Sequence, residues 1–297
     1  MFIQLLHSGY VMPCLCSCKE VELHKFRWCL LLTSILPQEG WILSNNWTRE
    51  QSILALYLYC QTSFGQIHSR NKQIIELARL IGRTPGALSM KMCNFASFDP
   101  ELRSRGISGL SNASRLDTEI WNEFSSDFSL LSYEATAILS KLKNQTMESF
   151  VEKETLPEIP LGNTRSQIIR ARINQTFFRR ALLSSYDSTC CVTKMQVPNL
   201  LVASHIKPWR VCNDAEKTDP RNGLLLNAFH DKAFDLGYIT INTKFEIVVS
   251  SQAESSYDSK FCREWLVSLS GREIERPDKF LPSSKFIEYH NDVVFLK

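Results

Sequence analysis

The sequence predicts an α+β protein in which a mostly helical N-terminal domain precedes a C-terminal domain of helices and short strands. Two observations predict this order. Apolar residues recur with helical spacing between residues 47 and 92, whereas short apolar runs separated by turn residues follow residue 190. With 297 residues, 44% of them hydrophobic and 22% charged, the chain is long and apolar enough for two domains, each with its own core.

The domain boundaries follow from shifts in composition along the chain. Pro157, Pro160 and Gly162 stand among acidic residues with little periodicity, which is typical of a linker. Residues 1–43 lack clear periodicity, and we interpret them either as an upstream extension or as a small capping segment. The expected segments are an N-terminal extension (1–43), a helical domain (44–142), a linker (143–163) and a C-terminal domain (164–297).

Capping signals place the first helices. Thr48 is a plausible N-cap before a buried helix, and Thr84 followed by Pro85 is a typical start of a later one. Between them a helix is expected from about Asn71 to Leu80, and Gly82 ends it.

A helix, a short glycine turn and a second helix form the layout of a helix-turn-helix unit. If this unit reads DNA, Arg83 and Lys91 are available to contact it. The alternative is a helical hairpin that only serves as a scaffold.

The chain concentrates positive charge after the linker, although its net charge is only +3. Residues 161–210 contain eight Lys or Arg residues against the single acid Asp187, which indicates a surface that meets an anion such as nucleic acid. A helix is expected from Thr164 to about Leu183. Its buried stripe contains Ile169, Ile173 and Phe177, and Arg165, Arg172 and Arg179 share another face suited to phosphate oxygens.

The cysteines and apolar runs bear on the cellular setting. None of the ten cysteines forms a CxxC pair, so no structural zinc is expected, and free thiols indicate a reducing, cytoplasmic context. The longest apolar run, Ile53–Cys60, is too short to span a membrane. No export signal is evident at the N-terminus.

The C-terminal domain is expected to begin with short strands. Cys191–Thr193 and Leu200–Ala203 are predicted as two strands, with His205 at the end of the second. Later, Tyr238–Ile241 and Phe245–Val249 alternate as a hairpin does.

Two residue types in this region, histidine and aspartate, point to hydrolysis of a phosphodiester. A neutral imidazole at His205 can take a proton from water near neutral pH. Asp231 and Asp235 lie four residues apart, on one face of a helix, and can hold one hard divalent cation, Mg²⁺ by default and Mn²⁺ as a substitute. His230 adds an imidazole that favours softer metals if it is a ligand.

Three phrases together resemble the HNH endonuclease family, within the stretch Ser166–Ser250. They are Ser204-His205-Ile206-Lys207-Pro208-Trp209, Asn222-Gly223-Leu224-Leu225-Leu226-Asn227 and His230-Asp231-Lys232-Ala233-Phe234-Asp235. The resemblance implies a ββα-metal domain in which His205 is the general base and Asn222 braces the active-site loop. The last motif residue would ligate the metal: His230 is the literal third letter, while the nine-residue step from Asn222 points to Asp231. Ser204 departs from the Asp or His that the family often has before the base.

The resulting hypothesis is a metal-dependent endonuclease that acts on double-stranded DNA, in restriction or other defence, as a homodimer and without a membrane association. Lys207 is a candidate phosphate contact, or simply a solvated lysine. The alternatives are a DNA-binding protein with a decayed nuclease domain, which Ser204 favours, and an RNA-directed nuclease.

Overall fold

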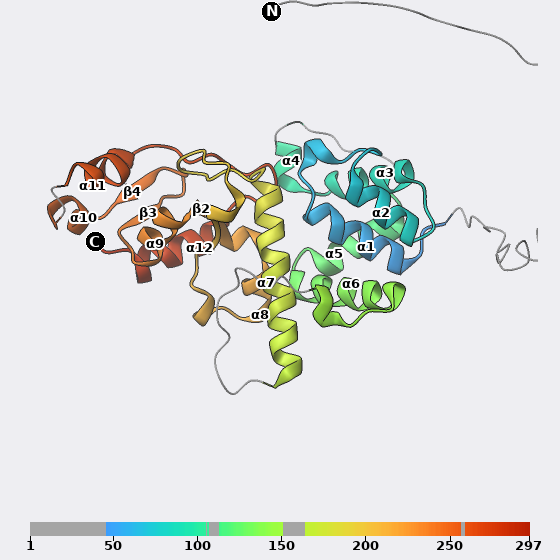
Figure 1. Ribbon diagram of the computed structural model, residues 1–297. Coiled ribbons are helices and arrows are strands. Elements are labelled where there is room, and N and C mark those ends of the chain that lie inside the picture. The colour runs from blue at the N-terminus through green and yellow to red at the C-terminus, as the bar shows by residue number, and fades with distance from the viewer. Residues whose placement is uncertain (1–45, 105, 107–112, 151–163, 257–258) are drawn as a thin grey trace, which may run out of the picture. The chain divides into compact units, whose positions relative to one another are not determined.

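The computed structural model describes residues 46–297 except 105, 107–112, 151–163 and 257–258 (Figure 1). The described residues belong to one compact unit, Ser44–Lys297. The predicted N-terminal extension, residues 1–43, and most of the predicted linker therefore lie outside the described residues.

Helices dominate the first part of this unit, and short helices and strands follow. The helices of the first part are α1 (Arg49–Cys60), α2 (Lys72–Leu80), α3 (Pro85–Ala96), α4 (Pro100–Ser104), α5 (Arg115–Phe124), α6 (Phe128–Lys143) and α7 (Arg165–Ser185). The elements that follow are β1 (Leu201–His205), α8 (Asp214–Thr218), β2 (Gly223–Asn227), α9 (Ala228–Asp235), β3 (Ile239–Ile241), β4 (Ile247–Val249), α10 (Ser251–Ser256), α11 (Lys260–Trp265) and α12 (Ser284–Tyr289). This arrangement confirms the α+β class with a helical N-terminal region.

The predicted helix starts are confirmed by their cap geometry. The side chains of Thr48 and Thr164 each accept a hydrogen bond from the third backbone N–H of their helix. Each threonine in turn donates its own backbone N–H to the side-chain oxygen of the glutamine at that third position, which completes a capping box. Thr84 caps α3 with Pro85 in the first turn. Gly82 adopts φ +69° between α2 and α3, a conformation that favours glycine and ends the helix.

The first sheet differs from the predicted pairing. β1 pairs antiparallel with β2, so that Leu201 faces Asn227 and His205 faces Gly223. The predicted strand at Cys191–Thr193 is wrong, because these residues form a turn in which the backbone N–H of Cys190 donates to the Met195 carbonyl. The apolar run of β2 is buried along its whole length and takes the place beside β1 instead. The predicted hairpin is confirmed as β3 and β4.

Two clusters of buried residues form the core, and α7 contributes to both. Phe177 and Ala181 pack with the helices α1–α6, whereas Phe178 and Leu182 pack with β1, β2 and the C-terminal elements. In Figure 1 this long helix lies between the two groups of elements. The 3.6-residue helical period turns neighbouring side chains to different faces, so one helix serves two cores.

Lys279 ties the C-terminal elements to α1. Its side chain is fully buried, and its ammonium donates to the carbonyl oxygens of Tyr59 at 2.6 Å and Thr62 at 2.8 Å. Tyr59 lies in the last turn of α1 and Thr62 just past its end, where a cation is favoured by the helix dipole. Burial lowers the pKa of Lys279 to about 8.

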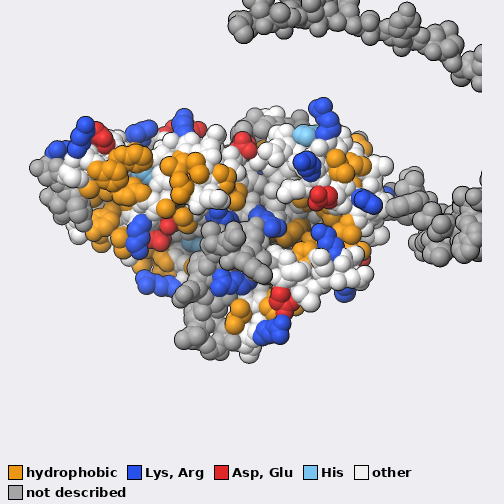
Figure 2. Space-filling view, viewed as in Figure 1, with side chains coloured by type: hydrophobic (Ala, Val, Ile, Leu, Met, Phe, Trp, Pro, Cys, Tyr) orange, Lys and Arg blue, Asp and Glu red, His pale blue; other side chains and the backbone are white. Residues whose placement is uncertain are grey.

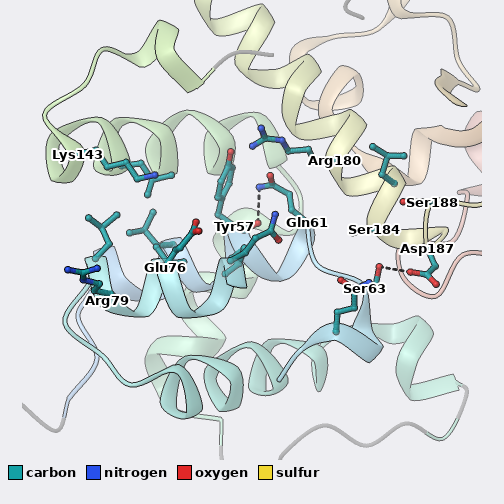
Figure 3. A pocket seen from close by; sticks show the side chains of 18 residues that line it. Tyr57, Gln61, Ser63, Glu76, Arg79, Lys143, Arg180, Ser184, Asp187 and Ser188 are labelled. Carbon is teal, nitrogen blue, oxygen red and sulfur yellow. Dashed lines mark hydrogen bonds between the residues drawn. The ribbon is translucent and has the colours of Figure 1, made fainter. Parts of the chain in front are cut away.

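A groove of about 1020 Å³ lies between α1, α2, α6 and α7 (Figure 3). Its apolar residues include Leu54, Leu77 and Leu183. In Figure 3, Lys143 of α6 lies across the groove from Glu76 and Arg79 of α2. Of the helices that the structure describes, none is both long and apolar enough to cross a membrane.

Candidate active site

His205 ends β1, and contacts on two sides fix its ring. The imidazole stacks on the Phe178 ring of α7, with centroids 4.0 Å apart and planes 10° from parallel. Its Nε2 lies 3.0 Å from the backbone carbonyl oxygen of Lys217. A carbonyl oxygen only accepts, so the proton resides on Nε2, and Nδ1 carries the lone pair that a general base needs.

The same surroundings keep His205 neutral. Burial lowers its pKa to about 4, and the hydrogen bond to the Lys217 carbonyl opposes this shift only in part. The imidazole is therefore unprotonated at pH 7.

The strand opposite His205 approaches α7 closely. A Cβ atom at Gly223 would lie 2.8 Å from Cζ of Phe178 and 2.5 Å from Cδ1 of Leu182. Both of these side chains are buried in the core. Glycine at this position therefore allows Phe178 to lie flat against His205.

Asn222 closes the loop between β1 and β2. Its side chain is fully buried, and Oδ1 accepts from the Lys207 backbone N–H at 2.8 Å. Its Nδ2 donates to the Glu216 carbonyl at 3.1 Å, and its own carbonyl accepts from the Ile206 N–H at 2.9 Å. The Asn222 side chain thus bonds to both ends of the loop between β1 and β2. The same loop carries Lys217, whose backbone carbonyl orients His205.

Replacing Asn222 by alanine should loosen this loop before the rest of the fold. The Lys207 N–H and the Glu216 carbonyl, both partly buried, lose their partner, which costs up to about 1–3 kcal/mol each. We expect faster amide hydrogen exchange in residues 206–221 and a lower urea midpoint. Asn199→Ala, at an exposed position next to β1, is the control. Unchanged exchange in the loop would show that Asn222 does not brace it.

Asp231 and Asp235 lie one turn apart on α9. Burial and repulsion from Asp231 raise the pKa of Asp235 to about 6, and burial also raises the pKa of Asp231. A carboxylate whose charge is disfavoured by a neighbouring carboxylate fits a cation site, because a bound cation relieves the repulsion.

Ser204 supplies a third oxygen, beside Asp231. Its hydroxyl is buried and close enough to Asp231 to lower the pKa of that carboxyl, yet it makes no hydrogen bond of ordinary geometry within the described residues. A buried polar atom without a partner fits a missing ligand. Among the described residues no group of three or more His, Cys, Asp and Glu side chains could hold a metal ion. The oxygens of Asp231, Asp235 and Ser204 are hard donors, the kind that Mg²⁺ and Mn²⁺ prefer.

His230 is placed differently from the acidic pair. It is fully buried, its Nε2 donates to the Trp265 carbonyl at 2.8 Å, and its Nδ1 lies 3.1 Å from Asn227 Oδ1. Burial lowers its pKa. Both ring nitrogens are directed at protein oxygens, so the geometry favours the other sequence-based assignment, in which Asp231 is the ligand.

The arginines predicted as a row on α7 have separate surroundings. Arg165 is exposed and bonds to Glu148, and Arg172 contacts Gln175 at 3.5 Å. Arg179 donates to the carbonyls of Leu201 and Pro198, which fixes the start of β1 against the helix. On the face shown in Figure 2, Lys and Arg side chains are scattered among apolar and uncharged ones.

Three further basic residues predicted to bind nucleic acid have partners within the protein. Lys207 bonds to Glu216 at 2.7 Å and is mostly covered. Arg83 donates to Gln51 and lies 4.9 Å above the Trp47 ring. Lys91 is buried in an ion pair with Asp117. These groups hold the fold together in this structure.

Some residues of the site were not expected from the sequence. Phe178 orients His205 but stands among other apolar residues of α7, and Lys217 acts through its backbone carbonyl. No side-chain pattern can reveal a backbone group. His205 stands at the end of β1 in a unit of two antiparallel strands followed by a helix, α9, that carries the acidic pair Asp231 and Asp235.

The comparison with protein families agrees with this geometry. Residues 190–242 match the HNH endonuclease family HNH_2, and this segment is an HNH endonuclease domain. This match supports nuclease activity on nucleic acid in general terms. A search of curated proteins returned no match.

Proposed function

We propose that the chain is a metal-dependent DNA endonuclease in which His205 activates the attacking water. The observation that carries this is the Nε2 bond of His205 to the Lys217 carbonyl, within the segment that matches the HNH family. Nδ1 would take the proton of a water molecule as its oxygen attacks phosphorus, and the bond to the leaving oxygen would break. Neutral His205 needs no prior deprotonation at pH 7.

Asp231, Asp235 and the Ser204 hydroxyl would hold a divalent cation, Mg²⁺ or Mn²⁺. When bound, the cation offsets charge on the phosphate and assists the leaving oxygen. In this proposal α9 and β1 position these oxygens. Pairing with β2 holds β1 in place, and Asn222 holds the loop that follows β1.

Double-stranded DNA as the substrate and restriction of foreign DNA as the setting rest on likeness to the HNH family. One site would cut one strand, so a double-strand break would need two copies and hence a homodimer on DNA. A cytoplasmic location is part of the proposal. The cysteines that the structure describes are free thiols, as a reducing compartment maintains them.

The test is cleavage of supercoiled plasmid with Mg²⁺, with Mn²⁺ and with EDTA, together with Mn²⁺ titration by calorimetry. Asp231→Asn combined with Asp235→Asn should weaken metal binding at least about 100-fold and abolish nicking. Asp292→Asn, at an exposed site near the C-terminus, is the control. DNA binding without cleavage in any metal would identify a decayed nuclease. Cleavage of RNA alone would identify an RNA-directed enzyme.

Acid should inhibit cleavage through the metal site rather than through His205. Asp235 takes up a proton near pH 6, whereas His205 stays neutral down to about pH 4. The rate should therefore fall as the pH drops through about 6. Since protons and metal compete for Asp235, raising Mn²⁺ should move this midpoint to lower pH. The measurement is the pH profile of the cleavage rate at two Mn²⁺ concentrations. The same midpoint at both concentrations would contradict this assignment.

A further inference from the structure

A small polar pocket of about 190 Å³ lies between α7 and the loop that carries α8. Its lining residues are Gln167, Arg170, Ala171, Asn174, Gln175, Trp209, Asp214 and Lys217. The pocket adjoins His205 in two ways. Lys217 provides the carbonyl that holds His205, and Gln175 precedes Phe178, the ring on which His205 stacks, by one helical turn.

Gln175 presents an unused donor at this pocket. Its side chain is 7% exposed, and its Nε2 has no hydrogen-bond partner among the described residues. The neighbouring amide of Asn174 is satisfied, since its Nδ2 donates to Ser129 and its Oδ1 accepts from Ser132. Buried amide groups in proteins are nearly always paired, so the unpaired Nε2 points to an acceptor that binds there.

The charges around the pocket favour an anion. Arg170 and Lys217 outnumber the one carboxylate, Asp214, which lies 3.4 Å from the Lys217 ammonium. The Arg170 guanidinium also lies 5.3 Å from the centre of the Tyr133 ring. A nucleobase is a poorer fit, because Lys217 already covers a face of Trp209 at 4.6 Å, where a base would stack.

We propose that this pocket binds a backbone phosphate of the strand being cut, beside the scissile phosphodiester, with Gln175 Nε2 as a donor and Arg170 and Lys217 as counter-charges. The inference rests on the proposed function, because it assigns the phosphate to the nuclease substrate. It also gives α7 a binding role in addition to its two packing faces. Such a contact fixes the position of the strand and carries no sequence information.

The first experiment measures binding of a fluorescent DNA duplex by anisotropy in EDTA, so that cleavage does not interfere. Gln175→Glu puts a carboxylate where the phosphate would lie, and Gln175→Leu removes the donor at similar volume. We expect a loss of affinity of about tenfold or more for both, larger for the glutamate. Gln252→Glu, exposed on α10, makes the same charge change and should leave affinity unchanged. Thermal melts check that each variant is folded.

The second experiment separates a phosphate from a base. Loss of one phosphate contact lowers the slope of log affinity against log salt by about one. Arg170→Gln should do so, and a duplex with a neutral methylphosphonate at the contacted position should lose affinity for the wild type but not for this variant. An unchanged slope, with affinity that depends instead on an abasic position, would overturn the phosphate assignment in favour of a base.

The outcomes distinguish the pocket from the nuclease. Cleavage by the wild type with undiminished binding by both Gln175 variants overturns the pocket and leaves the enzyme. Weakened binding by these variants with no cleavage in any metal supports the pocket and overturns the enzyme. A wild type that cleaves plasmid but shows no measurable phosphate-dependent binding of any duplex also overturns the pocket.

Discussion

His205→Ala should lower the rate of plasmid cleavage by about 10²–10⁴-fold, the usual contribution of a positioned general base. The imidazole is not among the proposed metal ligands, and the contacts of Asp231, Asp235 and Asn222 do not involve it. The Mn²⁺ affinity of the variant should therefore stay close to that of the wild type. The loss therefore belongs to the chemical step, and it should appear in the single-turnover rate at saturating metal.

Two controls keep this result interpretable. His68→Ala removes an exposed imidazole outside the site and should retain full activity. The stacked Phe178 ring loses a neighbour in the His205 variant, so a melting curve must show that the protein is still folded. Full activity in a folded His205→Ala protein would exclude this residue as the base, whatever the metal dependence shows.

Asp117→Ala should destabilise the helical part of the protein by about 3–5 kcal/mol, because it leaves a buried ammonium without its counter-charge. Lys91 is 4% exposed and Asp117 is fully buried, and their charged atoms lie 2.5 Å apart. Asp117 also accepts from the Ser114 N–H at 3.0 Å and from Asn94 at 3.3 Å. With a whole-protein stability of about 5–15 kcal/mol, this loss is large. Urea unfolding at constant salt measures it.

A double variant separates the ion pair from a DNA contact. Asp117→Leu with Lys91→Met removes both charges and should recover much of the stability, since no buried charge is left alone. If Lys91 serves only the fold, this double variant should bind DNA as the wild type does. A loss of DNA affinity in the folded double variant would restore Lys91 to the nucleic-acid surface and contradict the structural role.

Local patterns in the sequence predicted the features that depend on neighbours in the chain. Thr48, Thr84 and Thr164 act as caps because each bonds to backbone N–H groups within one turn, and Gly82 ends α2 through its own backbone freedom. The motif around His205 and the acidic pair on α9 could likewise be recognised, because the number of residues between their members can be read directly from the sequence. The family match at residues 190–242 agrees with that recognition.

The tertiary structure decided the pairing and the surroundings of these residues. Cys191–Thr193 is apolar enough for a strand, yet the partner of β1 is the longer apolar run of β2, a choice made by burial against α7. Arg83 and Lys91 were expected at a surface, but their partners Gln51 and Asp117 come from other helices. Lys279 caps a helix more than 200 residues before it. The sequence by itself determined the caps, the helical periods and the reactive residue types, since these depend on local spacing. Only the fold decided which groups are buried, paired or left without a partner, because desolvation and hydrogen bonding depend on residues distant in the chain.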